Sequence, residues 1–380
     1  MIKRLAALLL FLHFSVAYSQ TIKTDVVVIG GTPSGVAAAI QCARSKVKTV
    51  LVQQERVFIQ NADTVKNLSI DNNTKFVSIK KDDDRWGVVI SVNGKTEMLK
   101  PRVVVDATEN GTVVKAAGLK YTELDVVQTV AQAKEYRTSI ATGDVGVGLD
   151  ALAANNYPPL PGYIVPIKAL IVKGADNLLF IGDLLPGANK LGDQLALGQG
   201  AGVTAAYCAF FKTTTANLNV RAIQVELLDF KGYLLPFTDI SGDPYWRSIQ
   251  QVCATGMLKG KQKSIDGKPQ FLFMPDSIVT TAEIKPVMEE TYTRAFLWFN
   301  REKPGKEFTV GNLLSFISEL TLTDPDNLQR MIEKAWTEQY KFKSAFDLER
   351  PITRREFAIL ANKYLNPFAR TVDLDGRIVN

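Results

Sequence analysis

The segment DVVVIGGTPSGVAAA (residues 25–39) constrains the fold more than any other part of the chain. Residues 25–29 are an apolar, β-branched run, which is typical of a strand buried on both faces of a parallel sheet. A turn with three glycines follows, and then a helix of small residues. Residues 48–52 form a second apolar run. This order predicts a βαβ unit that binds a nucleotide at its glycine turn.

The glycine turn departs from the G-x-G-x-x-G pattern at its middle glycine, where Thr32 stands. Gly30 supplies the sharp turn, and Gly35 allows the helix to approach the strand. A threonine fits only if its side chain points away from the phosphates or if its hydroxyl joins their hydrogen bonds. Pro33 suits the start of the helix, because its missing N–H would be unpaired there. We therefore predict that a pyrophosphate binds at this helix N-terminus.

The second strand ends in Val52-Gln53-Gln54-Glu55, where an acidic residue is expected to hold the adenosine ribose. Gln53 takes the place of that acid. An amide can still bond a ribose hydroxyl, although less strongly than a carboxylate. Glu55 is the alternative ribose contact.

Further short strands are expected after the βαβ unit, at residues 74–79, 87–92, 95–99 and 102–105. Asn93-Gly94 is a two-residue hairpin signal. The last strand leads into the segment VVVDATENG, and much later Gly182-Asp183 precedes a helix rich in glycine and alanine. These additions favour FAD over a site for NAD alone.

Together these pieces resemble the two-dinucleotide-binding-domain flavoproteins, and more narrowly the secreted bacterial FAD-dependent oxidoreductases with a G-G-T-P fingerprint. The resemblance covers residues 24–119 and 162–212. It implies a Rossmann-like α/β fold with a parallel sheet and a β-meander, and non-covalently bound FAD. The residues that it implies for cofactor binding are Gly30, Gly31, Thr32, Pro33, Ser34, Gly35, Gln53, Gln54, Phe76, Val77, Ala107, Thr108, Glu109, Gly111, Gly182, Asp183, Gln194 and Leu195.

The resemblance also implies roles for these groups. The first turn would face the pyrophosphate, the backbone near Phe76 and Val77 the adenine, and Asp183 the ribityl chain or phosphate. The helix from about Gln194 would direct its positive end at the flavin. Glu109 stands where the family usually has glycine. The segments 55–73 and 120–162 are short for substrate domains, and no residue in them identifies itself as catalytic.

Residues 1–19 have the features of a cleaved secretory signal peptide. Lys3 and Arg4 precede an apolar run that is too short to span a bilayer, and cleavage is expected near Ser19. A buried N-terminal helix is the alternative. We expect an exported protein, periplasmic or at the cell surface or extracellular, without a transmembrane segment after cleavage. The net charge of +6 is spread along the chain, so nucleic-acid binding is not expected.

The only histidine, His13, lies in this signal segment. The mature chain would therefore have no Ser-His-Asp triad, no histidine metal ligand and no histidine-linked flavin. Any general base would be Asp, Glu, Lys, Tyr or a thiolate. Cys42, Cys208 and Cys253 are widely spaced, which indicates neither a disulfide framework nor a zinc site.

The chain after residue 215 is predicted to be mostly helical, with amphipathic helices at 311–320 and 324–340. Thr280 with Glu283 and Thr353 with Glu356 are capping-box patterns. Two stretches resemble surface-layer-homology repeats, which attach exported bacterial proteins to envelope glycans. The matching residues are Phe237, Asp239, Tyr245, Trp246, Gly256, Gly260, Phe273, Pro275, Thr280 and Glu283, and then Ile352, Thr353, Arg354, Glu356 and Phe357.

We thus expect a signal peptide (1–19), an FAD-binding domain (20–215) and a helical domain (216–380). The leading hypothesis is an exported FAD-dependent oxidoreductase that passes a hydride from a small-molecule substrate to flavin. The rival is a flavoprotein-like scaffold, or an envelope-glycan-binding protein with Trp246 and Arg354 as exposed glycan contacts. Packing of the helical domain against the flavin domain is the alternative to glycan attachment.

Overall fold

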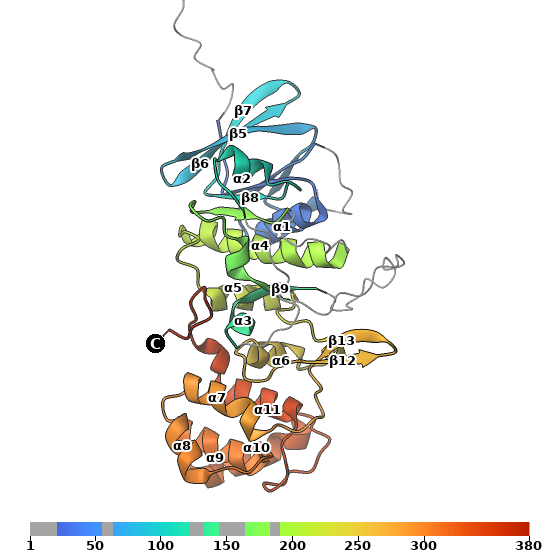
Figure 1. Ribbon diagram of the computed structural model, residues 1–380, viewed down its shortest axis with the longest axis vertical. Coiled ribbons are helices and arrows are strands. Elements are labelled where there is room, and N and C mark those ends of the chain that lie inside the picture. The colour runs from blue at the N-terminus through green and yellow to red at the C-terminus, as the bar shows by residue number, and fades with distance from the viewer. Residues whose placement is uncertain (1–20, 55–63, 122–132, 144–163, 183–190, 380) are drawn as a thin grey trace, which may run out of the picture.

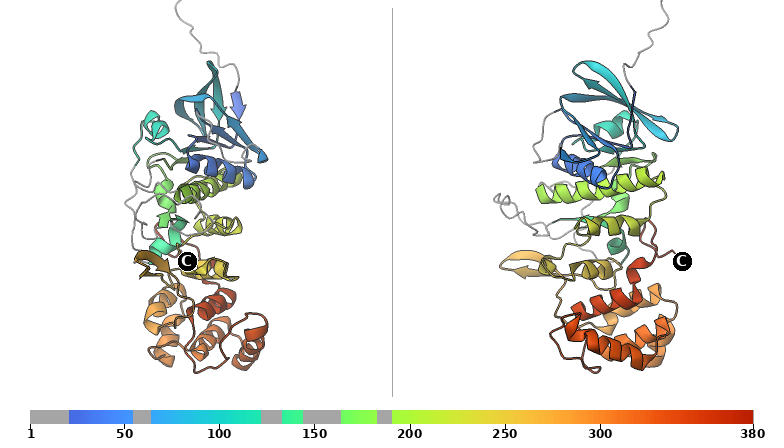
Figure 2. Two further views of the ribbon diagram at one scale, coloured as in Figure 1. Left: turned by 90° about the vertical axis from the view of Figure 1, so that its right-hand side faces the viewer. Right: turned by 180° about the vertical axis from the view of Figure 1, so that it is seen from behind.

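The computed structural model describes residues 21–54, 64–121, 133–143, 164–182 and 191–379, so the predicted signal peptide lies outside the described residues. The described parts form an elongated stack (Figure 1). Two sheets lie at one end, two long helices lie beneath them, and a helical bundle occupies the other end. The two further views in Figure 2 show the same order of layers.

A five-stranded parallel sheet with the order β11-β8-β2-β3-β4 is the centre of the first half. Its strands are β2 (Val26–Ile29), β3 (Thr49–Val52), β4 (Leu68–Asp71), β8 (Val103–Asp106) and β11 (Leu178–Phe180). Every residue of β2, β3, β8 and β11 is buried, as unbroken apolar runs require. The predicted α/β fold class is confirmed.

A second sheet, with the order β1-β7-β6-β5, packs at the top of the stack. Its strands are β1 (Thr21–Lys23), β5 (Thr74–Asp82), β6 (Arg85–Val92) and β7 (Lys95–Lys100). Asn93 and Gly94 have φ of 50° and 82°, as the expected hairpin turn requires. The last of the strands expected in this region becomes β8 and joins the parallel sheet, because it pairs with β2 over its whole length.

Two helices that cover the parallel sheet run side by side (Figure 1). They are α1 (Pro33–Arg44) and α4 (Leu191–Phe211). A Cβ added at Gly198 would lie 2.1 Å from the Ser34 oxygen, so only glycine permits this approach. Gly200 faces the other way, and its Cβ would lie 2.7 Å from the Ile140 oxygen. The glycines of α4 therefore let one helix pack closely on both sides.

A middle layer joins the sheet half to the helical half. Its elements are α3 (Ala133–Thr138), β9 (Ser139–Thr142), β10 (Ile164–Pro166), η3 (Ile167–Leu170) and α5 (Val220–Asp229), whereas the short helix α2 (Thr112–Ala116) lies among the two sheets (Figure 1). The buried Gln224 side chain donates to the oxygens of Arg137 and Ser139, at 3.1 and 2.8 Å. Helix α5, which follows the expected boundary at 215, thus packs directly on β9.

The rest of the chain is mainly helical, and its hairpin β12–β13, whose first strand is exposed, is visible at the side of the stack in Figure 1. The elements of this helical half are η4 (Thr238–Ile240), α6 (Trp246–Cys253), β12 (Lys261–Ile265), β13 (Lys268–Leu272), α7 (Thr281–Thr291), α8 (Ala295–Glu302), α9 (Val310–Thr321), α10 (Pro325–Glu338), α11 (Arg354–Leu360), the π-helical η5 (Ala361–Leu365) and η6 (Pro367–Ala369). The two amphipathic helices expected at 311–320 and 324–340 are confirmed as α9 and α10.

Three short extended segments meet in a closed ring at the centre of this bundle. The N–H of Val279 donates to the oxygen of Ile352, that of Ile352 to Phe308, and that of Phe308 back to Val279, each at 2.9 Å. Each segment then enters a helix, so that α7, α9 and α11 radiate from one hub. The bundle therefore contains three equivalent strand-to-helix units, although only the first and third were expected from sequence.

The threonines that precede these helices differ in their hydrogen bonds. At α11 the expected capping box is confirmed, because Thr353 accepts from the Glu356 N–H and the Glu356 carboxylate accepts from the Thr353 N–H. At α7 the expected box is wrong: the Thr280 side chain makes no capping bond. The Glu283 N–H donates to the backbone oxygen of Thr280 at 3.1 Å instead, and the Glu283 carboxylate is paired with the guanidinium of Arg354.

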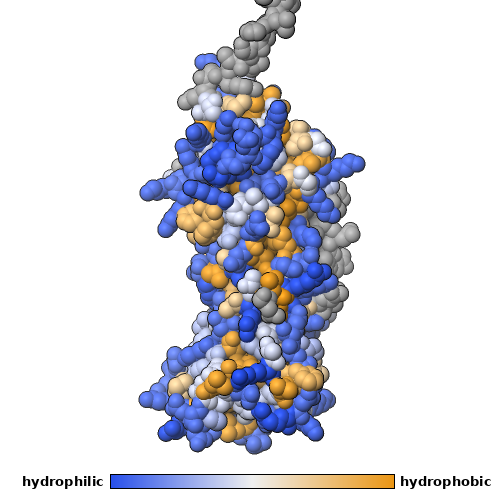
Figure 3. Space-filling model, turned by 90° about the vertical axis from the view of Figure 1, so that its left-hand side faces the viewer, coloured by the Kyte–Doolittle hydropathy of each residue, from blue (hydrophilic) through white to orange (hydrophobic). Residues whose placement is uncertain are grey.

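The surface is of mixed character. On the face in Figure 3, hydrophilic residues dominate the upper and lower ends, and a discontinuous band of hydrophobic residues runs between them. Large exposed apolar side chains include Phe210 and Phe211 at the end of α4, and Phe296 and Leu297 on α8. Among the described residues, no helix is both long and apolar enough to cross a bilayer.

Candidate functional site

Three turns meet at the carboxyl edge of the parallel sheet. Gly30 follows β2, Ala107 and Thr108 follow β8, and Gly182 lies just after β11. A Cβ at Gly30 would lie 2.5 Å from the Ala107 oxygen, and one at Gly182 would lie 1.9 Å from the Thr108 oxygen. Only glycine permits contacts this close. The structure thus brings together turns that the sequence places more than 70 residues apart, at the edge where open α/β sheets bind ligands.

The hydrogen bonds of the Thr32 side chain account for a threonine in the glycine turn. It is the N-cap of α1, and its hydroxyl oxygen accepts from the Gly35 N–H at 3.1 Å. The same hydroxyl lies 3.2 Å from the Ala107 oxygen and 3.1 Å from the Ser34 hydroxyl. The side chain is therefore directed into contacts within the protein. It caps the helix and ties the first turn to the second.

The N-terminus of α1 is suited to bind an anion. Pro33 occupies the first helical turn, and no acidic residue is present in that turn to neutralise the positive end of the helix. Gly31 and Thr32 are partly exposed at this end, whereas Ser34 and Gly35 are buried. The arrangement suits a phosphate group that approaches the backbone from outside.

Helix α4 begins on the same side, although the acidic Asp193 in its first turn offsets the positive end of the helix. Gly198 lies against Ser34 and Gly202 against Ala38, so that α1 and α4 run parallel in this register. The first turns of α4, which include the partly exposed Gln194 and Leu195, therefore extend beyond the N-terminus of α1. The predicted Asp183 lies outside the described residues.

Asp106 organises the second turn from within. Its buried carboxylate accepts from the N–H and hydroxyl of Thr108, at 3.0 and 2.6 Å, and from the N–H groups of Val113 and Val114, both at 2.9 Å. It thus caps α2, whose N-cap residue Gly111 has no side chain to do so. Burial raises the pKa of Asp106 above its ordinary value, against the lowering effect of these hydrogen bonds.

The remaining residues of the second turn differ in exposure. Glu109, which replaces the usual glycine, is exposed at the rim. Gly111 has φ of 60°, and a Cβ there would lie 2.4 Å from the ring of Tyr121. That ring in turn packs on Phe180 with centroids 4.1 Å apart. Gly111 is therefore required by the packing of an aromatic pair beneath the turn.

Gln53 carries an unpaired polar atom at the end of β3. The residue is 4% exposed, and its Nε2 donates to the Asn72 Oδ1 at 2.6 Å. Its Oε1 is buried and has no hydrogen-bond partner among the described residues. Buried acceptors are rarely left without a donor, so this atom fits a ligand hydroxyl. Gln54 is exposed, and Glu55 lies outside the described residues.

The predicted adenine contacts lie on β5, next to this position. The Thr74 N–H donates to the Gln53 oxygen at 3.1 Å, which places the start of β5 beside the end of β3. The pairing of β5 with β6 shifts between Phe76 and Ser78, so Val77 lies at an irregularity in the strand. Val77 is 54% exposed and Phe76 is partly buried. A purine-binding role for this backbone stays a prediction.

Sequence reasoning missed Asn72 and the capping role of Asp106. The signal for Asn72 was the stretch Asp71-Asn72-Asn73-Thr74, which is a turn between β4 and β5. Because β4 was not predicted, the turn was not placed beside Gln53. The signal for Asp106 was its position at the end of a buried strand, just before a short helix.

The described residues offer no metal centre, since no group of three or more His, Cys, Asp or Glu side chains is placed to hold an ion. All three cysteines are buried thiols, and burial raises the pKa of Cys42 and Cys208 to about 12. These thiols are therefore protonated at neutral pH and are poor candidates for a catalytic base.

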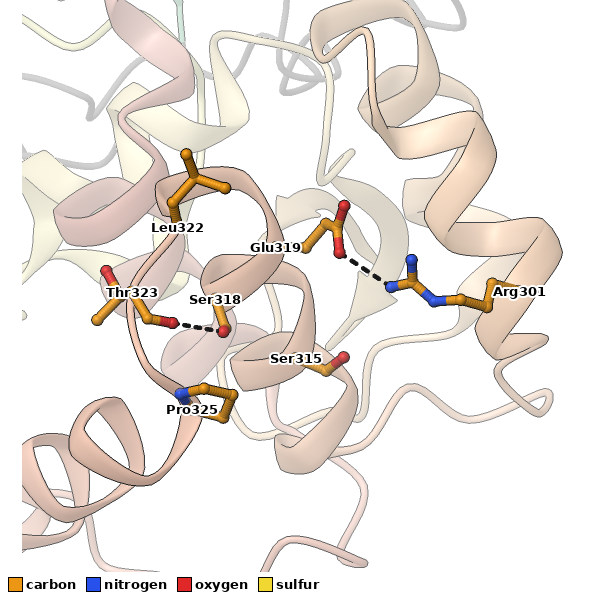
Figure 4. Close-up of a pocket in the computed structure, with 7 residues that line it drawn as sticks. All are labelled: Arg301, Ser315, Ser318, Glu319, Leu322, Thr323 and Pro325. Carbon is orange, nitrogen blue, oxygen red and sulfur yellow. Dashed lines mark hydrogen bonds and ion pairs between the residues drawn. The ribbon is translucent and has the colours of Figure 1, made fainter.

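A separate cavity of about 430 Å³ lies in the helical bundle (Figure 4). It is lined by Arg301, Ser315, Ser318, Glu319, Leu322, Thr323 and Pro325. Its polar groups bond one another: Arg301 pairs with Glu319 at 3.0 Å, and the Ser318 hydroxyl donates to the Thr323 oxygen at 2.6 Å. It shares no residue with the sheet edge, so we leave it outside the candidate site.

Comparison with known protein families gives a match that includes the glycine turn. Residues 25–59 match the family of FAD dependent oxidoreductases. This segment contains β2, the glycine turn, α1, β3 and Gln53, and the match supports FAD as the cofactor. No curated protein sequence matches the chain.

Solved structures with partial likeness include L-proline dehydrogenase from P. horikoshii, with 20% identity over 23% of each chain and a TM-score of 0.20. The rebeccamycin biosynthetic enzyme RebC with reduced flavin has 16% identity, covers 27% of this chain and 36% of its own, and has a TM-score of 0.23. Bacillithiol disulfide reductase from Bacillus cereus has 17% identity, covers 23% and 40%, and has a TM-score of 0.19. The matched part is thus less than half of each of these proteins.

Proposed function

We propose that the chain is an exported FAD-dependent oxidoreductase that acts on a small-molecule substrate. The observation that supports this most is the convergence of three turns at the carboxyl edge of the parallel sheet, next to two parallel helix N-termini. The family match at residues 25–59 covers the first of these turns. Export rests on the signal-like sequence of residues 1–19.

The residues present fit the adenosine diphosphate part of FAD. The turn from Gly30 to Gly35 and the N-terminus of α1 would hold the pyrophosphate, through backbone N–H groups and the positive helix end. The unpaired Oε1 of Gln53 would accept from a ribose hydroxyl. The N-terminal turns of α4 would lie near the flavin ring, where Asp193 of the first turn offsets the positive end of the helix. When bound, the flavin supplies the redox chemistry by accepting a hydride from the substrate.

No residue is available for a histidine linkage to the cofactor, since none occurs after His13. The three cysteines are buried. The flavin would therefore be held non-covalently and should be released when the protein is denatured.

The decisive experiment is the visible absorption spectrum of the purified full chain, before and after incubation with FAD and removal of the excess. We expect flavin bands that stay with the folded protein and pass into the filtrate after denaturation. The same treatment with FMN is the control, because FMN lacks the adenosine diphosphate that the glycine turn and Gln53 would hold. A colourless protein that retains no FAD would overturn the proposal.

A second candidate function is attachment to envelope glycans by the helical half. The ring of three strand-to-helix units favours it, because repeated helical modules are what the surface-layer-homology resemblance implies. Arg354 is withdrawn as a glycan contact, since its side chain is fully buried. Trp246 remains, stacked on Tyr233 with centroids 5.1 Å apart and partly exposed. Retention on isolated envelope polysaccharide, compared between wild type and Trp246→Ala, tests this function. Equal failure of both proteins to bind would eliminate it.

A further inference from the structure

Asn72, in the turn between β4 and β5, determines which atom of the Gln53 amide is left to bond a ligand. We infer that Asn72 is a positioning residue. It holds the Nε2 of Gln53, so that the end of β3 presents a neutral oxygen acceptor to a ribose hydroxyl of the adenosine diphosphate part of the ligand. This inference rests on the proposed binding of FAD at the same sheet edge.

The backbone of Gln53 is fixed on both sides by this turn. Its N–H donates to the Asp71 oxygen and its own oxygen accepts from the Thr74 N–H, both at 3.1 Å. Thr74 is buried, and its hydroxyl donates to the Asn72 oxygen at 3.1 Å. The backbone that carries Asn72 is therefore anchored next to the side chain that it contacts.

The side chain of Gln53 is fixed by its one hydrogen bond to Asn72. The 2.6 Å contact uses the nitrogen of the glutamine amide as donor and the oxygen of the asparagine amide as acceptor. Because this bond uses the Nε2, it leaves the Oε1 of the same amide free to accept from another group. That oxygen is buried and unpartnered among the described residues.

The Oε1 of Gln53 can bond only a group that donates a hydrogen bond. A carbonyl oxygen accepts hydrogen bonds and never donates, so the group opposite must carry a hydrogen. A ribose hydroxyl does so, and the preceding turn places a dinucleotide within the same edge of the sheet. Asn72 itself is exposed, which lets it be changed without disturbing the core.

The test isolates the contribution of the hydroxyl group. Isothermal titration of the full chain compares ADP with 2′-deoxy-ADP and with 3′-deoxy-ADP, and the ratio of their dissociation constants is the hydroxyl increment. Because the ligands differ by one hydroxyl only, a general change in charge or folding cancels in this ratio. The variants are Asn72→Ala, Asn72→Asp and Gln53→Ala. Asn73→Gly is the matched control, since glycine keeps the positive φ of 53° in the same turn.

For the wild type we expect an increment of about 3- to 10-fold for one of the two hydroxyls, which is the usual effect of one neutral hydrogen bond. Asn72→Ala should lower it below about twofold, close to the value for Gln53→Ala. Asn72→Asp should restore it, because a carboxylate still accepts from the Nε2 of Gln53. Asn73→Gly should match the wild type.

An unchanged increment in Asn72→Ala would overturn the role of Asn72, as would equal losses in Asn72→Asp and Asn72→Ala. In either case ADP and FAD would still bind the wild type, so the proposed function would stand. If the wild type bound neither ADP nor FAD, the proposed function would fail, and this inference with it.

Discussion

Arg354 offers the sharpest test of how the helical half is held together. Its side chain is fully buried at the end of the hub segment that enters α11. The guanidinium donates from Nε to the Phe273 oxygen at 2.7 Å and from one terminal nitrogen to the Lys259 oxygen at 2.6 Å. The other terminal nitrogen pairs with the carboxylate of Glu283. One side chain thus joins three separate segments of the chain.

Replacing Arg354 with alanine should destabilise the protein by about 3–5 kcal/mol, which is the usual cost of removing one partner from a buried ion pair. The carboxylate of Glu283 would lose its cation, and two carbonyl oxygens would lose their donor. The range of about 3–5 kcal/mol includes the loss of all these contacts, because the separate penalties of groups in one network do not add. A loss of this size is a large fraction of the total stability of an ordinary domain, about 5–15 kcal/mol.

The assay is urea unfolding followed by tryptophan fluorescence, since Trp298 and Trp336 are both buried in this bundle. The matched control is Arg301→Ala, because Arg301 is 56% exposed and its pairs with Glu302 and Glu319 lie at the surface. That variant should lose much less stability than Arg354→Ala, because solvent screens exposed ion pairs. Equal losses for the two variants, or a loss below about 1 kcal/mol for Arg354→Ala, would refute the argument from burial.

Three further outcomes follow from the same structure. Gly30→Ala should weaken FAD binding more than about tenfold by displacing the second turn, whereas Gly94→Ala, in a hairpin with open space around it, should leave FAD affinity unchanged in the same titration. Thr353→Ala should lower the free energy of unfolding in urea by about 1 kcal/mol, and Thr280→Ala should lower it clearly less, because the Thr353 hydroxyl caps a helix and the Thr280 hydroxyl does not. Equal losses for the two variants would contradict this. Cys42 should resist thiol reagents at pH 7 until the protein unfolds, since burial raises its pKa to about 12, and rapid labelling of folded protein would show otherwise.

The sheet edge could be predicted because its signals are local. Apolar runs define β2, β3 and β8, and parallel strands bring their carboxyl ends to one edge whatever lies between them in sequence. The turn at Asn93-Gly94 and the first turn of α1 are likewise determined within a few residues. For Thr32 the sequence left two alternatives, a side chain that points away from the phosphates or a hydroxyl that joins their hydrogen bonds, and the structure shows hydrogen bonds to Gly35 and Ala107 within the protein.

The contacts that were missed depend on residues distant in sequence. Glu283 has the spacing of a capping box with Thr280, but its carboxylate bonds the buried guanidinium of Arg354, 71 residues later in the sequence. Arg354 was expected to be exposed because arginine is rarely buried unless it is paired, and its partner was not identifiable from sequence. The second of the three units was missed because Asn312 replaces the glutamate of the capping box with Thr309, and an amide performs the same two bonds.

The segment between the second turn and Gly182 is short for a substrate domain, and its described part contacts the helical half. Arg137, on α3, is almost fully buried and forms two hydrogen bonds with Glu290 on α7, at 2.7 and 2.6 Å. It also donates to the Gly376 oxygen near the C-terminus, at 3.1 Å. Burial and this neighbouring cation lower the pKa of Arg221 to about 9, and Arg221 donates to the Arg370 oxygen. Two buried guanidinium groups thus clamp the C-terminal segment between α3 and α5. Residues of the described part of this segment therefore join the sheet half to the helical half and to the C-terminal segment.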